Sequence, residues 1–167
     1  MMDIRQIAYP RQVILVTSEA EAEIMGKRIE KSNIMAASWH MPASFEPLMY
    51  AIAVGKQRFS YELIKKSKVF CVNFMPFSLK DKVLFCGRKS GRLIDKFKES
   101  GLTPEECEKI HCKRIKEALA YIECEVINEV EAGDHVIFIG KAVNLKLKKE
   151  GKRVFQKGGD IFTTTED

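Results

Sequence analysis

The sequence predicts a mainly β domain, a barrel or a sandwich with short α insertions. At least six short apolar or alternating runs are separated by turn residues, which is typical of antiparallel β folds. The candidate helices between these runs are brief. No strand is followed by a GxGxxG segment and a long helix, which argues against a Rossmann domain. At 167 residues the chain is expected to form a single domain over residues 1–167 with a buried core.

The first strands are predicted from runs of β-branched residues. Residues 12–17 (QVILVT) form a short buried run that follows a proline. Residues 19–31 are ambiguous, because their Glu, Ala and Lys content favours a helix whereas Met25-Gly26 suits the turn of a hairpin. We favour strand and turn for this segment. Residues 33–38 are the next expected strand.

Two prolines then interrupt regular structure, so residues 39–47 are expected to be irregular. Residues 48–54 are apolar on both faces, as in a central strand. Residues 60–67 predict a short helix with Ser60 as its N-cap, an acidic residue in its first turn and lysines near its end. Residues 69–74 (VFCVNF) are expected to form a strand that contains one polar residue.

Short helices are predicted in the middle of the chain. Residues 79–85 and 93–100 suit helices, and Gly101 occupies the position of a C-terminal cap for the second one. The basic segment 86–92 between them is expected to be a flexible loop. Residues 103–106 (TPEE) carry the start signals of another helix, with proline at its first position.

The last third of the chain is expected to be β structure. Residues 119–130 alternate between apolar and polar, a Gly133-Asp134 turn follows, and a second alternating strand begins at His135. Between residues 143 and 149 lysines alternate with leucines, which suits an edge strand or a solvated face. The tail from residue 150 is polar and glycine-rich.

Charge and cysteine content limit the function classes. The net charge of +5, from 28 Lys and Arg against 23 Asp and Glu, favours anionic ligands such as nucleotides but is too weak to predict nucleic-acid binding. Five cysteines are an odd number for a disulfide framework. The N-terminus lacks a signal-peptide pattern, and no apolar run approaches the roughly 20 residues of a transmembrane helix. We therefore expect a cytoplasmic protein with reduced thiols and no membrane contact.

The main candidate site lies between residues 33 and 61. The small residues 36–38 would let a large flat ligand approach the backbone. Arg58 can bind two phosphate oxygens through its planar guanidinium, and Ser60 adds a hydroxyl. If Ser60 caps the helix, the free amides of the first turn would face the same anion. The alternative is a tight turn with an ordinary N-cap and a solvated arginine, which composition alone favours.

Three other groups of residues are weaker candidates. The glycines, the serine and the cations of the loop 86–92 could bind a phosphate, but their spacing does not match a Walker motif. A mobile basic loop without a ligand accounts for this composition equally well. Cys107, His111 and Cys112 form a fragment of a metal site without its second pair of ligands, so no metal is predicted. His135 follows a turn at a strand end, where it would either face a ligand or have no role. Since neither a nucleophile with its base nor a carboxylate pair is evident, either a cofactor performs the chemistry or the protein is not an enzyme.

Four blocks of sequence occur in a fixed order and carry a family resemblance. They are NIMAASWHMPASFEP, IAVGKQRFSYELIKKSKVFCVNF, CGRKSGRLIDKF and YIECEVINEVEAGDHVIFIGKAV. Together they resemble the flavin reductase-like family of FMN-binding split barrels, which includes flavoredoxin-type proteins. The resemblance extends from Pro10 to about Val143. It departs from many relatives at Ala37, where they carry threonine, and at Leu48, where they carry proline.

The resemblance implies a six-stranded antiparallel split β-barrel with small helices, working as a homodimer with FMN near the subunit interface. It implies an oxidoreductase that moves a hydride from NADH or NADPH through flavin to an acceptor such as free flavin, ferric iron or a redox protein. The alternative within the family is a flavoredoxin-type FMN electron carrier without direct NAD(P)H activity. A basic nucleic-acid-binding module is a third, weaker alternative.

The resemblance also implies roles for individual residues. Five residues at a strand end would line the isoalloxazine ring: Met35, Ala36, Ala37, Ser38 and Trp39. The remaining positions are Arg58, Ser60 and Tyr61 for the phosphate, Asn73 for the ring or ribityl chain, Ser90, Gly91 and Lys96 for a loop that covers the cofactor, and His135 for a position facing the flavin or nicotinamide.

Overall fold

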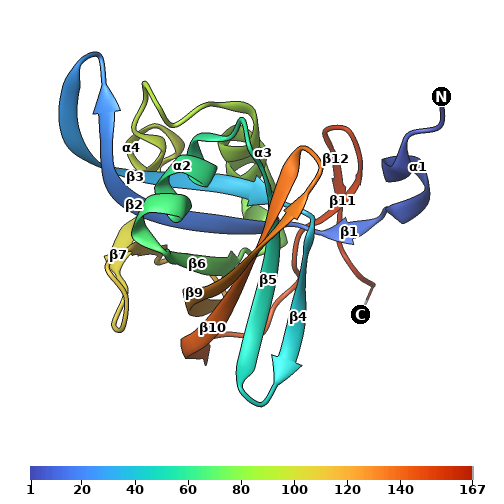
Figure 1. The fold of residues 1–167 in the computed structure, drawn as a ribbon. Helices are drawn as coiled ribbons and strands as arrows, with labels where there is room; N and C mark the ends of the chain where they lie inside the picture. Colours follow the sequence, from blue (N-terminus) through green and yellow to red (C-terminus); the bar gives the residue numbers. More distant parts are fainter. Residues whose placement is uncertain (167) are drawn as a thin grey trace.

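A computed structural model describes residues 1–166; Asp167, the last residue of the expected single domain over 1–167, lies outside the described residues. Strands dominate the molecule and short helices lie around them (Figure 1). The elements in chain order are α1 (Ile4–Ala8), β1 (Arg11–Gln12), β2 (Ile14–Ile24), β3 (Lys27–Ala37), β4 (His40–Phe45), β5 (Leu48–Gly55), α2 (Phe59–Ser67), β6 (Val69–Phe74), the 3-10 turn η1 (Phe77–Leu79), α3 (Lys80–Arg88), α4 (Lys96–Ser100), β7 (Pro104–Glu106), β8 (Lys113–Ile115), β9 (Ala120–Ala132), β10 (His135–Leu147), β11 (Phe155–Gly158) and β12 (Ile161–Thr163).

Seven antiparallel strands form the main sheet, in the order β3-β2-β6-β9-β10-β5-β4. The sheet is strongly coiled, because β2, β3 and β6 run across the molecule whereas β4, β5 and β10 cross them steeply (Figure 1). Within residues 1–166 the edge strands β3 and β4 do not pair with each other, so the sheet is open. The mainly β, antiparallel prediction is confirmed. The six-stranded barrel is not observed, since the sheet has seven strands and does not close.

An unpredicted strand, β4, lies in the segment 39–47 that the prolines predicted to be irregular. β4 pairs with β5 on one side only, with a register shift between Pro42 and Ser44. An edge strand tolerates a proline, because the missing N–H can face away from the partner strand. The prediction of irregular structure is therefore wrong for most of this segment.

The predicted helix start at residues 103–106 is also wrong. Pro104–Glu106 form β7, which pairs with β8 in a small separate hairpin. Glu105 and Arg114 are directly opposite in this pair, and Arg114 Nε donates to the Glu105 carboxylate at 2.8 Å. Opposite charges across a strand pair stabilise the hairpin, a cross-strand effect that the helix-start pattern does not include.

Two long hairpins agree with the predictions. Met25 and Gly26, with φ of 51° and 77°, join β2 to β3 in the left-handed conformation that a type I′ turn requires. This result excludes the helix alternative for residues 19–31. Gly133 and Asp134 join β9 to β10 as expected, with Gly133 at φ 63°.

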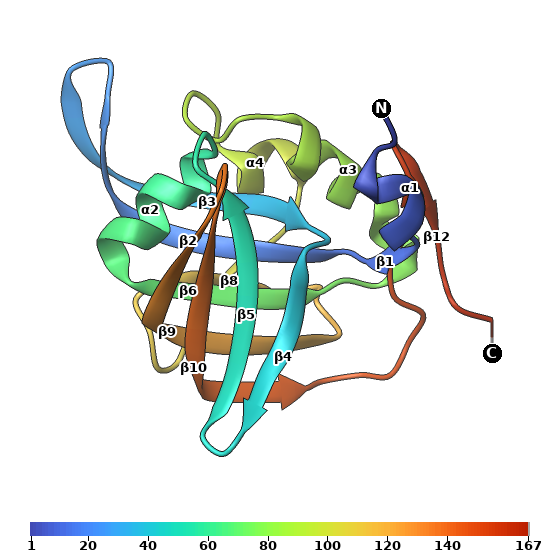
Figure 2. The ribbon, with the colours of Figure 1, turned by 45° about the vertical axis from the view of Figure 1, so that its right-hand side comes forward.

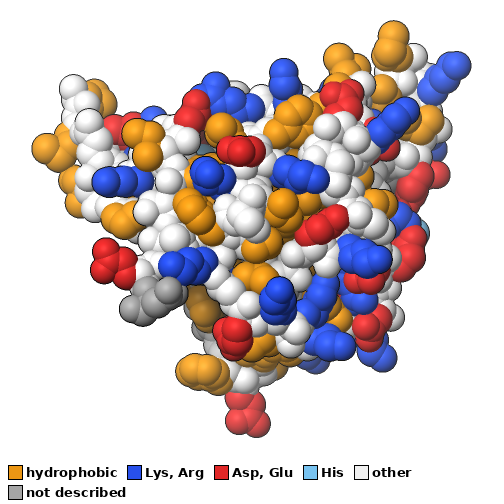
Figure 3. Space-filling view, turned by 180° about the vertical axis from the view of Figure 1, so that it is seen from behind, with side chains coloured by type: hydrophobic (Ala, Val, Ile, Leu, Met, Phe, Trp, Pro, Cys, Tyr) orange, Lys and Arg blue, Asp and Glu red, His pale blue; other side chains and the backbone are white. Residues whose placement is uncertain are grey.

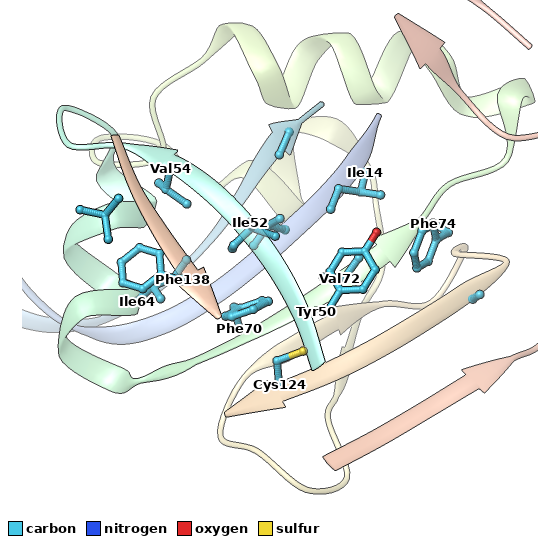
Figure 4. Close-up of a cluster of buried hydrophobic side chains, with 14 residues drawn as sticks. Ile14, Tyr50, Ile52, Val54, Ile64, Phe70, Val72, Phe74, Cys124 and Phe138 are labelled. Carbon is cyan, nitrogen blue, oxygen red and sulfur yellow. The ribbon is translucent and has the colours of Figure 1, made fainter. Parts of the chain in front are cut away.

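The main core fills the concave side of the coiled sheet. Figure 4 shows Phe70, Phe138 and Ile52 converging there from β6, β10 and β5, and all three are fully buried. Ile64 of α2 closes one end of this cluster. Each such side chain contributes about 1.5–3 kcal/mol through burial. A second cluster, which includes Val83 of α3, packs the helices against the outer side of β2 and β3.

A small second sheet, in the order β1-β11-β12, brings the two ends of the chain together. Arg11 of β1 is paired with Gln156 of β11. Figure 2 shows α1 and β12 side by side next to the far end of β3. Both termini are therefore available to build a site at that end. Among residues 1–166, no helix combines the length and apolar character that crossing a bilayer requires.

Gly140 of β10 gives a test of this packing. A Cβ added there would lie 2.6 Å from Cys124 Cβ and 2.7 Å from Phe70 Cζ, both in the main core. We expect Gly140→Ala to lower the free energy of unfolding by about 1–3 kcal/mol, because the added methyl group overpacks the core. Urea denaturation measures this. Gly158→Ala is the matched control, since nothing lies within 4 Å of an added Cβ there. Equal stability of the two variants would contradict the packing.

Candidate functional site

A pocket of about 550 Å³ opens where β3 ends, and it falls within the range of small-molecule sites. Its walls come from segments far apart in the sequence. The end of β3 and the residues that follow it form one side, the β5 end and the start of β10 form another, and α3, α1 and the β11–β12 hairpin complete it. The pocket therefore exists only in the folded chain.

The floor of the pocket is built from small side chains. Ala36 and Ala37 lie on β3, where pairing with Leu15 and Ile14 of β2 fixes their position. Helix α3 approaches this floor closely, since a Cβ on Gly87 would lie 3.1 Å from Ala36 Cβ. The lack of bulk on both elements leaves room for a broad flat ligand against the backbone.

Two rings form one wall of the pocket. Trp39 and His135 lie with their ring centroids 4.9 Å apart at an interplanar angle of 33°. His135 Nδ1 lies 2.7 Å from the Asp134 carboxylate, and this hydrogen bond lowers the pKa of Asp134. Because Nδ1 donates to that carboxylate, Nε2 of a neutral imidazole is left as an acceptor. The pair offers an apolar surface next to a polar nitrogen.

Three arginines line the pocket, and two of them have acidic partners. Arg5 donates to Asp3 at 2.9 Å, and Arg88 donates to Asp160 at 3.0 Å. Arg58 differs, because within residues 1–166 its guanidinium forms no ion pair. It stands at the N-cap of α2 and also borders a neighbouring shallow cationic depression. An unpaired guanidinium at a pocket rim is suited to bind an anionic ligand.

The structure brings together all five residues expected to line the ring, one residue expected to bind the phosphate, and the histidine expected to face the flavin or nicotinamide. Those that line this one pocket are Met35, Ala36, Ala37, Ser38, Trp39, Arg58 and His135. Ser38 is further held by the N-terminal segment, because its Oγ lies 2.8 Å from Tyr9 Oη and its carbonyl accepts from Arg11 Nε at 2.7 Å. The residues after β3 are thus fixed before any ligand arrives.

Ser60 and Tyr61 do not reach the pocket. Helix α2 begins at Phe59 with Arg58 as its N-cap, so the prediction that Ser60 caps the helix is wrong. Ser60 is buried, and its Oγ accepts from Asn33 Nδ2 at 2.8 Å. Tyr61 packs against Phe138 with a centroid distance of 6.1 Å, and it borders the cationic depression beside Arg58. The expected phosphate corner is therefore reduced to Arg58 at the pocket itself.

Asn73 has a structural role and does not line the pocket. It is fully buried, its Nδ2 donates to the Leu15 carbonyl at 3.0 Å, and its Oδ1 accepts from the Ile115 amide at 2.9 Å. Both ends of the amide are thus satisfied between β2 and the residues of β8. The position expected to contact the ring or ribityl chain instead joins two sheets.

The segment expected to cover the ligand lies behind β3. Lys96 is buried, and its Nζ donates to the carbonyls of Ile34 at 2.6 Å and Cys86 at 2.7 Å. Burial lowers the pKa of Lys96 to about 8. Gly91 packs so tightly that an added Cβ would lie 1.8 Å from Asn33 Oδ1, whereas Ser90 is exposed. Lys96 therefore supports the pocket floor from behind and does not line it.

Residues from both termini line the pocket without having been predicted. Asp3, Arg5 and Tyr9 come from the N-terminal segment, and Asp160 and Phe162 come from the β11–β12 hairpin. They reach the site through the pairing of β1 with β11. Two apolar pairs in an otherwise polar tail, Val154-Phe155 and Ile161-Phe162, are the sequence signal that this tail packs against something.

The fragment considered as a metal site is divided by the fold. His111 turns toward β3, where its Nε2 lies 2.7 Å from Glu30 Oε1. This hydrogen bond and the nearby carboxylate of Glu19 raise the pKa of His111. Cys107 and Cys112 instead face a cluster that contains Cys71. The imidazole and the thiols therefore point to different neighbours.

Comparison with known proteins places the chain among flavin-related folds. A family model described as "Flavin reductase like domain" matches residues 5–160. An uncharacterized protein of Aeropyrum pernix is 37% identical over 140 residues, which is 83% of this chain and 50% of the relative. The chain thus spans about half the length of that relative.

Two solved structures share the fold. Flavoredoxin from Methanosarcina acetivorans matches with a TM-score of 0.82 at 24% identity, over 100% of this chain and 91% of the other. An NADH:FAD oxidoreductase of Streptomyces globisporus matches with a TM-score of 0.82 at 20% identity, over 98% and 92% of the two chains. At these identities the likeness shows the fold alone.

Proposed function

The chain belongs to the flavin reductase-like domain family, and on that basis we propose that it binds FMN in the pocket at the end of β3 and acts as an FMN-dependent oxidoreductase. One observation carries the proposal. Seven residues that the resemblance assigns to flavin contacts line a single pocket: Met35, Ala36, Ala37, Ser38, Trp39, Arg58 and His135.

The residues present suit such a ligand. The floor of Ala36 and Ala37 accepts a flat ring, and Trp39 with His135 supplies a partly apolar wall. The unpaired guanidinium of Arg58 supplies charge-assisted donors for a phosphate. This donor set matches a ligand that is aromatic at one end and anionic at the other.

In the proposed mechanism the bound flavin supplies hydride and electron transfer, which the side chains alone do not provide. The chain's own residues bind and orient it. Arg58 neutralises the phosphate, the β3 floor holds the ring plane, and Trp39 with His135 excludes water from one side. His135 Nε2 offers an acceptor or, when protonated, a donor at the pocket wall.

The proposed reductant is NADH or NADPH, and the proposed acceptor is free flavin, ferric iron or a redox protein. The runner-up is a flavoredoxin-type carrier that holds FMN without reacting directly with NAD(P)H. A flavoredoxin and an NADH:FAD oxidoreductase both share this fold. The choice between reductase and electron carrier therefore depends on whether the FMN-loaded protein reacts with NAD(P)H.

A homodimer is also proposed. An apolar groove of about 320 Å³ adjoins the pocket, and Trp39 lines both of them. Met41 of the edge strand β4 lines the groove and is 57% exposed, and Phe45 at the far end of the same strand is 97% exposed. Covering this edge strand with a second copy would remove apolar surface from water, and at Met41 that surface belongs to the groove that adjoins the pocket.

The nucleic-acid alternative gains no support from the surface. Figure 3 shows Lys and Arg interspersed with Asp and Glu on the face it presents, not gathered into a stripe. Near Arg58 the cations are also paired with acids: Lys65 and Lys68 with Glu129, and Arg92 with Glu62. A phosphate backbone requires an extended row of free cations.

Arg58→Ala tests the phosphate contact. We expect the Kd for FMN to rise about 30-fold or more, which corresponds to about 2 kcal/mol, because a charge-assisted contact is lost. Flavin fluorescence titration of the purified protein measures this. Arg28→Ala is the matched control, since Arg28 is an exposed arginine on the β2–β3 hairpin far from the pocket. An unchanged Kd for FMN in Arg58→Ala would refute the proposal that Arg58 binds the phosphate.

Anaerobic mixing with reduced nicotinamide tests the reaction. If the protein is a reductase, NADH or NADPH bleaches the flavin absorption of the FMN-loaded protein at a rate that saturates with nucleotide. The measurement is stopped-flow absorbance, with dithionite as the control that the flavin is reducible. Flavin that dithionite reduces but neither nucleotide bleaches would refute the reductase proposal in favour of the carrier.

A further inference from the structure

Three of the five cysteines gather outside the pocket. Cys71 of β6, Cys107 after β7 and Cys112 before β8 belong to one cluster. Figure 1 shows β7 at the opposite side of the molecule from α1 and β12, which border the pocket. Over residues 1–166 all five cysteines are free thiols. The proposed flavin chemistry gives this cluster no role.

Cys107 and Cys112 face each other across the β7–β8 hairpin. The β7–β8 pairing ends with Glu106 opposite Lys113, and one further step puts Cys107 opposite Cys112. The Cys107 amide donates to the Cys112 carbonyl at 2.9 Å, which agrees with that register. Directly opposed residues of an antiparallel pair have Cα atoms about 4.5–5.5 Å apart, within the roughly 4.4–6.8 Å that a disulfide spans.

A buried carboxylate holds the loop between the two cysteines. Glu123 of β9 is fully buried and accepts the backbone amides of Glu108 at 3.0 Å and Lys109 at 2.8 Å. The same carboxylate accepts from Arg114 and from Asn144, each at 3.1 Å. Four donors on one carboxylate are unusual for a surface loop. They hold the backbone of this loop in place, and a side-chain hydrogen bond between Cys107 and Cys112 places the two sulfurs next to each other.

The two thiols have different surroundings. Cys107 is partly exposed, and hydrogen bonds from the Cys112 and Cys71 thiols lower its pKa to about 5, with the Arg114 guanidinium acting in the same direction. Burial of Cys107 and the charge of Glu123 oppose this shift. Cys112 is buried, and its hydrogen bond to Cys107 together with burial raises its pKa. A reachable thiolate therefore lies beside a sheltered thiol.

We propose that Cys107 and Cys112 form a redox-active dithiol that reacts with hydroperoxides and closes to a disulfide. In the first step the Cys107 sulfur attacks a peroxide oxygen. The S–O bond forms, the O–O bond breaks, and the departing hydroxide or alkoxide takes a proton to leave as water or an alcohol. Cys107 becomes a sulfenic acid.

In the second step the Cys112 sulfur attacks the Cys107 sulfur. The S–S bond forms, the S–O bond breaks, and the hydroxide leaves as water with the proton from Cys112. In sum, two thiols and one hydroperoxide give one disulfide, one water and one further molecule of water or alcohol. The peroxide is the oxidant and the two sulfurs supply both electrons. The step needs no flavin.

The remaining cysteines provide internal controls. Burial raises the pKa of Cys86 to about 11 and that of Cys124 to about 12, so both stay protonated at neutral pH. Neither belongs to the cluster that contains Cys107. Only Cys107 combines access to solvent with thiolate character, and we expect oxidation to begin there.

The test treats the reduced full-length protein with one equivalent of hydrogen peroxide, blocks remaining thiols with an alkylating reagent and maps the peptides by mass spectrometry. We expect a Cys107–Cys112 disulfide that dithiothreitol reverses. In Cys112→Ser we expect dimedone to trap the Cys107 sulfenic acid, and in Cys107→Ser peroxide consumption should fall at least about tenfold. Cys124→Ser should behave as the unmodified protein.

Direct mapping of the unmodified protein keeps the test valid even if a variant folds poorly. Three results would overturn the proposal. One is a Cys107 that remains reduced while Cys86 or Cys124 oxidises. Another is Cys107 that passes to the sulfinic acid with no disulfide to Cys112. The third is a disulfide that joins Cys107 to Cys71 or to a second chain.

Discussion

The pairing of β3 with β2 is the constraint on which the rest of the candidate site depends. Its register runs from Ile24 opposite Lys27 to Ile14 opposite Ala37, and the two buried faces around Ile14 and Leu15 exclude a slip by one residue. The pocket floor is the last part of this ladder. Lys96 adds a second anchor, because its buried ammonium binds the Ile34 carbonyl from behind. A small-residue floor stays flat only when the strand beneath it is held in this way.

Charge in this molecule is arranged so that buried ions are satisfied and one pocket cation is left open. Glu123 has four donors, and Lys96 has two carbonyl acceptors, so neither is an uncompensated buried charge. Arg5 at the pocket is neutralised by Asp3 of its own segment, and Arg88 is neutralised by Asp160 of the β11–β12 hairpin. Arg58 is the exception at the pocket, because its guanidinium has no acidic partner among residues 1–166. For this reason we propose that Arg58 binds the phosphate.

Local patterns in the sequence predicted most strands of the main sheet, both long hairpins and the part of the site that is continuous along the chain. Met35 to Trp39 follow one another, so a single strand end delivers them together. The errors arose where tertiary contacts decide. Ser60 is a residue type that often caps helices, but here its hydroxyl accepts a hydrogen bond from Asn33. Asn73 joins β2 to β8. The residues supplied by the termini depend on the β1–β11 pairing, which no local pattern encodes.

The central claim, that FMN binds at the end of β3, is tested most directly through the single tryptophan of the chain, Trp39, which lines the pocket. FMN is titrated into the apoprotein while Trp39 emission and flavin absorption are recorded together. The account predicts saturable quenching of Trp39 emission that follows the change in the flavin bands with one Kd. FMN that fails to bind, or that binds and leaves Trp39 emission unchanged, would contradict the account.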